Sequence, residues 1–196
     1  MAFYAFNALL ARMKYIARWG LMRASRTESL SEHTADAAIL AHTLCLISNQ
    51  MFGTNVRAET VTVAALYHDA SEILTGDMPT PVKYKNETLR SAYKSLEKSA
   101  ADSLVLLLPS ELQGEMRGYL REENLTEKEA QLLKAADRLS ALIKCIDEEQ
   151  SGNREFAGAK RQQGEALAAM HCAEADYFME HMLPCYAWTL DELSQG

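Results

Sequence analysis

Three side chains that can bind a metal or carry a proton stand close together in the chain: His68, Asp69 and Glu72. They interrupt an apolar stretch, residues 63–81, that has the pattern of a helix ending in a turn. In a helix, Glu72 follows His68 by four residues and Asp69 by three, so the three side chains share one face. The cluster therefore predicts half of a metal site on a helix, next to a turn that carries a further carboxylate, Asp77.

Two more residues of metal-ligand type occupy the apolar faces of other predicted helices. His33 continues the apolar stripe of a helix over 30–51, and Asp137 stands on the apolar side of a helix over 127–150. One alternative makes His33 a hydrogen-bonded core residue and Asp137 half of a buried salt bridge. A cation explains all four residues together, because it satisfies two carboxylates and orients two imidazoles at once.

Helical periodicity without period-two alternation predicts an all-α protein, a single irregular bundle of six to seven helices that forms one domain over residues 1–196. Capping boxes at Ser29-x-x-Glu32 and Thr126-x-x-Glu129 introduce two of these helices. The other helical segments are predicted at 3–17, 57–74, 86–107, 109–120, 154–181 and 188–194.

Three local expectations complete this picture. Pro79 and Pro81 should keep the chain from resuming a helix after the turn. The helix over 86–107 should point Leu96 inward, and the charged run at 147–149 should be a solvated helix end.

Composition narrows the range of partners. A formal net charge of −7 argues against a surface for a nucleic acid polymer, but it does not exclude a small phosphorylated substrate. No stretch reaches the roughly 20 apolar residues of a membrane span. Four scattered cysteines indicate reduced thiols in a cytoplasmic protein. Residues 1–27 are basic like a transit peptide, but an ordinary first helix is favoured because no cleavage pattern follows.

The spacing His33…His68-Asp69…Asp137 resembles the HD superfamily of metal-dependent phosphohydrolases, which is named after the adjacent His-Asp pair. Flanking segments narrow this resemblance to the bacterial HD-domain 5′-deoxynucleotidases over nearly the whole chain. They read RW at 18–19, SEH at 31–33, YHDASE at 67–72 and LTGDMPTPVK at 74–83.

The resemblance implies a homodimer that hydrolyses deoxyribonucleoside 5′-monophosphates to the deoxynucleoside and phosphate, selectively for deoxyribose and broadly for the base. It also implies one divalent transition metal ion, with cobalt, manganese or copper first, held by His33, His68, Asp69 and Asp137. Mixed nitrogen and oxygen ligands also suit zinc, nickel or iron, and they suit magnesium and calcium less well.

The resemblance assigns the reacting end of the substrate to Arg18 and Glu72. Arg18 would hold the phosphate with its forked donors, and its alternative role is to satisfy carbonyls at a helix end. Glu72 would be the general acid or base, either positioning water or protonating the leaving 5′-oxygen, and its alternative is a hydrogen bond to a ligand histidine. His33 and Asp137 are counted among the substrate contacts as well.

The same resemblance assigns the sugar to the segment before the first capping box and to the turn. Trp19 would leave no room for a ribose 2′-hydroxyl, and Asp77 would accept a hydrogen bond from the 3′-hydroxyl. Met78, Pro79 and Thr80 would form the adjacent wall. The alternative makes Trp19 a core anchor and Asp77 a turn residue.

Two other functions are compatible with part of this pattern. One is a different HD phosphohydrolase, acting on a nucleoside triphosphate, a cyclic nucleotide or an alarmone. The other is a non-enzymatic helical scaffold with a structural or vestigial metal. Arg18, Glu72 and Asp77 argue against the scaffold, because a structural metal site needs none of them.

Overall fold

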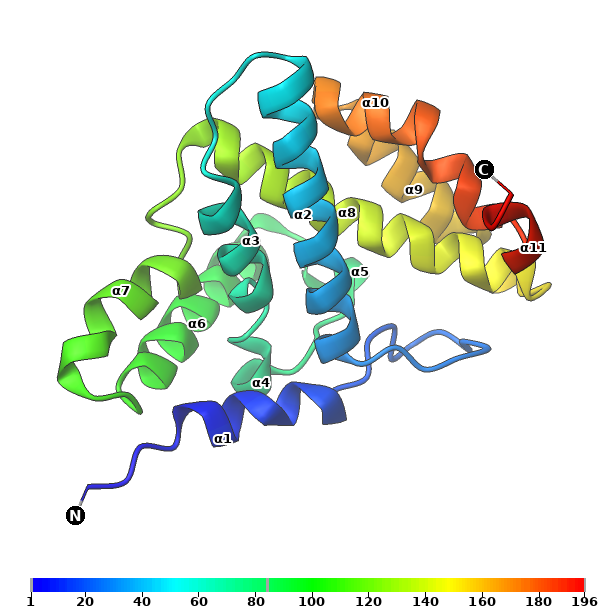
Figure 1. Cartoon of the computed structure of the whole chain (residues 1–196). Helices are drawn as coiled ribbons and strands as arrows, with labels where there is room; N and C mark the ends of the chain where they lie inside the picture. The colour runs from blue at the N-terminus through cyan, green and yellow to red at the C-terminus, as the bar shows by residue number, and fades with distance from the viewer. Residues whose placement is uncertain (1, 84, 196) are drawn as a thin grey trace.

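The computed structural model describes residues 2–83 and 85–195, and every regular element in these ranges is helical (Figure 1). The centre of the bundle is formed by α2 (Leu30–Met51), α3 (Ala58–Tyr67) and α8 (Glu127–Gln150). Around them lie α6 (Glu87–Val105), α7 (Ser110–Leu120), α9 (Ala157–Ala168) and α10 (Ala173–His181), and α1 (Phe6–Leu10) runs across one end (Figure 1). The all-α prediction is therefore confirmed.

Short segments connect the main helices, so the helical pieces outnumber the six to seven expected. They are the 3-10 turns Ala11–Tyr15, Arg154–Phe156 and Leu183–Ala187, and the one-turn helices α4 (Glu72–Thr75), α5 (Thr80–Lys83) and α11 (Leu190–Leu193). No helix in the described ranges is long and apolar enough to cross a membrane.

Both predicted capping boxes are present. The Ser29 hydroxyl accepts from the Glu32 amide at 3.3 Å, and the Glu32 carboxylate accepts from the Ser29 amide at 2.8 Å. Thr126 and Glu129 make the same reciprocal pair at 3.3 and 2.9 Å. Each cap contributes about 1 kcal/mol and fixes where α2 and α8 begin. The positions of His33 and Asp137 along these helices follow from the caps.

Two apolar cores hold the helices together. The larger core lies between α2, α3, α8 and α10 and includes Leu44, Ala65 and Leu139, each 0 % exposed. The smaller core joins α1, α6 and α7 and includes Phe6. Ala70, in the turn after α3, is fully buried in the smaller core. The turn that carries the His-Asp pair thus lies between the two cores.

The continuous helix predicted over 57–74 is wrong, because the structure breaks it after Tyr67. The amides of Ala70 and Glu72 bond to the third residue back, Tyr67 and Asp69, at 3.0 and 2.9 Å. These bonds make a tight turn over 68–71, after which α4 begins at Glu72. Glu72 therefore opens a separate helix and does not share one helical face with the His-Asp pair.

Three other expectations are corrected. The helix predicted over 154–181 is divided, with a corner at His171, whose φ is 48°. α5 begins at Thr80 despite Pro81, because a proline in the first helical turn removes no required hydrogen bond. Leu96 is 52 % exposed, since the buried face of α6, which contains Tyr93 and Leu104, is centred on the other side of the helix.

Glu148 also differs from the expected solvated helix end, because it is 0 % exposed. Its carboxylate accepts from the Ser25 amide at 2.8 Å, from Asn153 Nδ2 at 2.7 Å and from Lys144 Nζ at 2.5 Å. Burial alone would raise its pKa, but these hydrogen bonds lower the pKa from 4.5 to about 2. Glu148 thus fixes the irregular segment 20–28 against the end of α8.

We predict that Glu148→Ala lowers the free energy of unfolding by about 3 kcal/mol, because the buried Lys144 ammonium loses its partner. Urea denaturation should show this loss, whereas Glu149→Ala, at an exposed neighbouring position, should change stability by less than about 0.5 kcal/mol. The folded-state pKa is depressed, so the contribution is full above about pH 4.5 and is lost as pH falls towards 2. Equal losses in the two variants would contradict this role.

Candidate active site

Three elements bring the four residues predicted as metal ligands together. His33 comes from the first turn of α2, His68 and Asp69 from the turn after α3, and Asp137 from the middle of α8. His33 Nε2 lies 3.4 Å from Asp69 Oδ2 and 3.3 Å from Asp137 Oδ1. His68 Nε2 lies 3.1 and 3.9 Å from the same two oxygens. Two imidazoles and two carboxylates therefore face a common point.

The hydrogen bond on the far side of the His68 ring determines its tautomer. His68 Nδ1 is 2.7 Å from the carbonyl oxygen of Ala65, which can only accept, so Nδ1 carries the proton. In the neutral ring, Nε2 then has a free lone pair directed at the carboxylates. His33 Nδ1 lies 3.0 Å from the Ser140 hydroxyl, which holds that ring but can donate or accept.

The donor set fits a transition metal ion. Both Nε2 atoms, of His33 and His68, are buried without a hydrogen-bond partner among the described residues. Donor atoms of His33, His68 and Asp69 lie within 4.8 Å of one another and can hold a metal ion. Ligands bonded at about 2.1 Å and at right angles are about 3 Å apart, close to the separations found here. Asp137 lies at the same point through its contacts with both rings.

The charges of the cluster also favour a cation. Burial would raise the pKa of Asp69, but the two histidines outweigh it and hold the pKa well below its ordinary value. Burial acts the same way on Asp137, whose pKa is lowered by Lys134 and by the histidines. The nearby carboxylates in turn hold the pKa of His68 well above its ordinary value, against the effect of burial. Both carboxylates are thus ionised and available as ligands.

The pKa of Glu72 is shifted upwards, in the opposite direction to the pKa values of Asp69 and Asp137. Its side chain is almost fully buried, and Oε2 has no hydrogen-bond partner among the described residues. Burial, together with the charges of Asp69 and Asp77, raises its pKa to about 9, although Lys83 and Arg18 oppose the shift. Such a carboxyl group is protonated at neutral pH and can donate a proton, while a cation bound nearby lowers the pKa.

Arg18 and Trp19 lie beside this cluster and share a partner that the sequence did not reveal. Glu28 Oε2 accepts from Arg18 Nη1 at 3.0 Å and from Trp19 Nε1 at 2.8 Å. Arg18 Nε is buried without a hydrogen-bond partner in the described part of the chain. Neither periodicity nor a motif marks Glu28, which is the last residue of the irregular segment 20–28.

The predicted catalytic and sugar-binding side chains line one cleft of about 410 Å³. The predicted residues in its wall are Arg18, Trp19, Asp69, Glu72, Asp77, Met78, Pro79 and Asp137. His33 and His68 do not line it, and their side chains are only 0 % and 7 % exposed. The side chain of Thr80 lies outside what the structure describes.

Two lysines of this cleft were missed by sequence reasoning. Lys134 Nζ lies 2.5 Å from Asp137 Oδ2, one turn earlier on α8, so the i, i+3 spacing was an available signal. Lys83 contacts Glu97 at 2.6 Å and lies 4.8 Å from the centre of the Tyr93 ring. Both lysines add positive charge to a cleft that contains four carboxylates.

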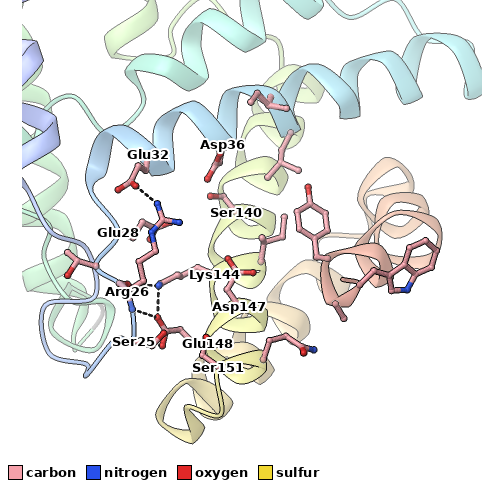
Figure 2. A pocket seen from close by; sticks show the side chains of 18 of the residues that line it. Ser25, Arg26, Glu28, Glu32, Asp36, Ser140, Lys144, Asp147, Glu148 and Ser151 are labelled. Atoms are coloured by element: carbon pink, nitrogen blue, oxygen red, sulfur yellow. Dashed lines mark hydrogen bonds and ion pairs between the residues drawn. The ribbon is translucent and has the colours of Figure 1, made fainter. Parts of the chain in front are cut away.

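A larger cavity, of about 730 Å³, has Glu28 in its wall (Figure 2). Its wall combines Lys144, Asp147 and Glu148 of α8 with Arg26 and Asp36, and Figure 2 shows Lys144 bonded to Glu148 there. None of the four predicted metal ligands lines it. We therefore place the chemistry in the smaller cleft.

The helical architecture is that of the HD-domain phosphohydrolases. A solved HD-domain phosphohydrolase from Listeria innocua matches with a TM-score of 0.81 at 24 % identity, covering 92 % of this chain and 87 % of that one. A cyanophage S-2L HD phosphohydrolase, whose structure is described as bound to dA and one catalytic Zn²⁺ ion, matches with a TM-score of 0.66 at 18 % identity. That alignment covers 90 % of this chain and 95 % of the phage protein.

Sequence comparison defines the family within this class. The model of the YfbR-like 5′-deoxynucleotidase family matches residues 5–186. A 5′-deoxynucleotidase from Cronobacter sakazakii is 47 % identical over 190 residues, which are 97 % of this chain and 96 % of that protein. The chain belongs to the YfbR-like 5′-deoxynucleotidase family and is a hydrolase. The resemblance found in the sequence is thereby confirmed, and the scaffold alternative is excluded.

We predict that Mn²⁺ or Co²⁺ stabilises the protein through the histidine and aspartate cluster. At a free metal concentration one hundred times Kd, the free energy of unfolding should rise by about 2.7 kcal/mol. His68→Ala should abolish this rise in a thermal-shift titration. His42→Ala, on the exposed face of α2, should keep it. An unchanged metal response in His68→Ala would refute ligation by His68.

Proposed function

We propose that the protein hydrolyses 2′-deoxyribonucleoside 5′-monophosphates to the deoxynucleoside and phosphate, with selectivity for deoxyribose and little preference among bases. One divalent transition metal ion would be held by His33, His68, Asp69 and Asp137. The observation that carries the proposal is the single cleft in which Arg18, Trp19, Glu72 and Asp77 surround the two carboxylates of that cluster. This arrangement provides separate groups for the phosphate, the leaving oxygen and the sugar.

The phosphate is assigned to Arg18. Its Nη1 is occupied by Glu28, and an anion would be bound by the side edge of the guanidinium, whose Nε has no hydrogen-bond partner among the described residues. This edge offers two parallel donors that match two oxygens of a phosphate. A divalent ion held by the neighbouring cluster would neutralise phosphate charge and lower the pKa of a bound water.

Glu72 is assigned the proton of the leaving group. Hydrolysis forms a bond from a water oxygen to phosphorus and breaks the bond from phosphorus to the 5′-oxygen, which leaves as an alkoxide unless it gains a proton. The raised pKa of Glu72 favours the protonated acid over the water-positioning base. Glu72 would give its proton to the 5′-oxygen and recover one from the attacking water.

The sugar is assigned to Trp19 and Asp77. Trp19 comes from the segment before α2 and Asp77 from the turn after α4, and both line the cleft. Burial raises the pKa of Asp77, and the charge of Arg18 opposes this shift. Asp77 is therefore close enough to Arg18 for both side chains to act on one small substrate. A ribose 2′-hydroxyl pressed against the indole would lose its hydrogen bonds to water, at a cost of about 1–3 kcal/mol. Met78, Pro79 and Thr80 are proposed to form the adjoining wall.

The remaining predictions complete the proposal. Cobalt, manganese and copper are the metals expected from the family, and the Zn²⁺ named for the cyanophage relative adds support for zinc, with nickel and iron as alternatives. A homodimer, a cytoplasmic location, a single domain over residues 1–196 and the absence of a nucleic acid or membrane partner also stay predictions.

We predict that purified protein with Co²⁺ or Mn²⁺ releases phosphate from dAMP about 10-fold or more faster than from AMP, since the lost hydrogen bonds of the 2′-hydroxyl correspond to about 1–3 kcal/mol. 3′-dAMP, dATP and a cyclic dinucleotide should be poor substrates in the same assay. Equal kcat/KM values for dAMP and AMP would refute the sugar selectivity, and preferred turnover of dATP would favour a different HD phosphohydrolase activity.

We predict that Glu72→Ala lowers kcat by roughly 10²–10⁴-fold while the metal content, measured by elemental analysis, stays at the wild-type value. For the wild type, the rate should fall as pH rises through the pKa of Glu72, and Glu72→Gln should lack this fall. Glu59→Ala, at an exposed carboxylate of α3, is the matched control and should keep full activity. Loss of metal from Glu72→Ala would instead make Glu72 a ligand.

A further inference from the structure

We propose that Glu28 is a positioning residue of the reaction, which sets the phosphate contact and the sugar contact together by holding Arg18 and Trp19 on one carboxylate oxygen. The inference rests on the roles proposed above for those two residues. Glu28 itself lines the larger cavity (Figure 2), whereas its two donors, Arg18 and Trp19, line the cleft.

The three side chains form a compact, buried group. Glu28 Oε2 accepts from Arg18 Nη1 at 3.0 Å and from Trp19 Nε1 at 2.8 Å, and the Arg18 guanidinium lies 5.7 Å from the centre of the indole. The side chains of Arg18 and Glu28 are only 12 % and 10 % exposed. A charge-assisted hydrogen bond in such surroundings is stronger than one in water and fixes the orientation of its donor.

The main chain ties Glu28 to the segment that it positions. The Arg18 amide donates to the Glu28 carbonyl at 2.9 Å, and Ala17 and Ser29 form an isolated antiparallel bridge. Ser29 is the N-cap of α2, the helix that carries His33 in its first turn. The carboxylate of Glu28 is therefore fixed relative to the metal cluster as well as to Arg18.

Trp19 needs this support, because its φ is 61°, in the left-handed region that a bulky side chain adopts only with strain. Contacts to its carbonyl, its ring and its indole nitrogen help to hold it there. The Met22 amide donates to the Trp19 carbonyl at 2.7 Å, the Phe156 ring packs on the indole with centres 5.3 Å apart, and Glu28 holds the indole nitrogen. Of these, only Glu28 fixes the polar edge of the indole.

Glu28 also determines how the Arg18 guanidinium is oriented. Asp69, Asp77 and Asp137 all lie close enough to attract the Arg18 guanidinium. With Nη1 held by Glu28, the guanidinium is kept from turning towards these aspartates. Without that anchor, Arg18 is free to pair with Asp69 or Asp137, where it would compete with a cation and leave the phosphate unbound.

The test compares Glu28→Ala, Glu28→Gln and a matched control, Glu155→Gln. Glu155 holds the same irregular segment through the Arg23 amide at 3.1 Å, but it has no bond to Arg18 or Trp19. For each protein, kcat and KM are measured with dAMP and with AMP, and circular dichroism checks the fold. The indole N–H resonances of the two tryptophans are recorded without substrate, with Trp188 as the internal reference.

Glu28→Ala should lower kcat/KM for dAMP by about 10–100-fold and should lower the dAMP to AMP ratio at least fivefold, since both substrate contacts lose their orientation. The Trp19 indole resonance should shift while that of Trp188 stays. Glu28→Gln, whose amide oxygen can still accept both bonds, should recover most of the ratio. Glu155→Gln should match the wild type in all measurements.

A loss of the same size for dAMP and AMP in Glu28→Ala, with the ratio unchanged, would overturn the inference and leave Glu28 a structural residue. An unmoved Trp19 resonance would overturn it as well. Failure of the proposed function has a different signature, because the wild type itself would then show no preference for dAMP while the Trp19 resonance would still respond to Glu28→Ala.

Discussion

Two carboxylates and two imidazoles meet in the interior, and the need to satisfy them governs much of this structure. His33 and His68 direct Nε2 atoms that have no hydrogen-bond partner among the described residues at the ionised Asp69 and Asp137. Groups of this kind are costly to bury alone. The capping boxes of α2 and α8, the bond from Ser140 to His33 and the tight turn after α3 all serve to aim them at one point.

The proposed active cleft holds neighbouring carboxyl groups whose pKa values are shifted in opposite directions. Asp69 and Glu72 are three residues apart, yet the pKa of Asp69 is lowered by histidines and that of Glu72 is raised to about 9 by burial and by like charge. The break after Tyr67 produces this difference, since it places Glu72 at the start of its own short helix. One ionised and one protonated carboxyl group is the arrangement that metal-assisted hydrolysis with an acid for the leaving group requires.

Sequence reasoning succeeded where structure is decided locally and failed where distant residues decide it. The capping boxes at Ser29 and Thr126, each only four residues long, predicted where α2 and α8 begin, and the inward position of His33 followed from helical spacing. The break after Tyr67 was not predicted, because it depends on a hydrogen bond from the His68 side chain to the carbonyl of Ala65. Helix propensities do not account for such a side-chain bond. Glu28 and Glu148 were missed because their burial depends on partners in other segments, as with Ser25 and Glu148, which are 123 residues apart.

The place of the His-Asp turn between two apolar cores has a consequence for how the molecule tolerates change. Ala65, whose carbonyl orients His68, belongs to the larger core, and Ala70 belongs to the smaller one. A change in the packing of α1, α6 or α7 would thus displace Ala70 and, with it, the predicted metal ligands His68 and Asp69. None of those three helices supplies a predicted ligand itself. We therefore expect a substitution in one of the two cores to require a matching change in the other.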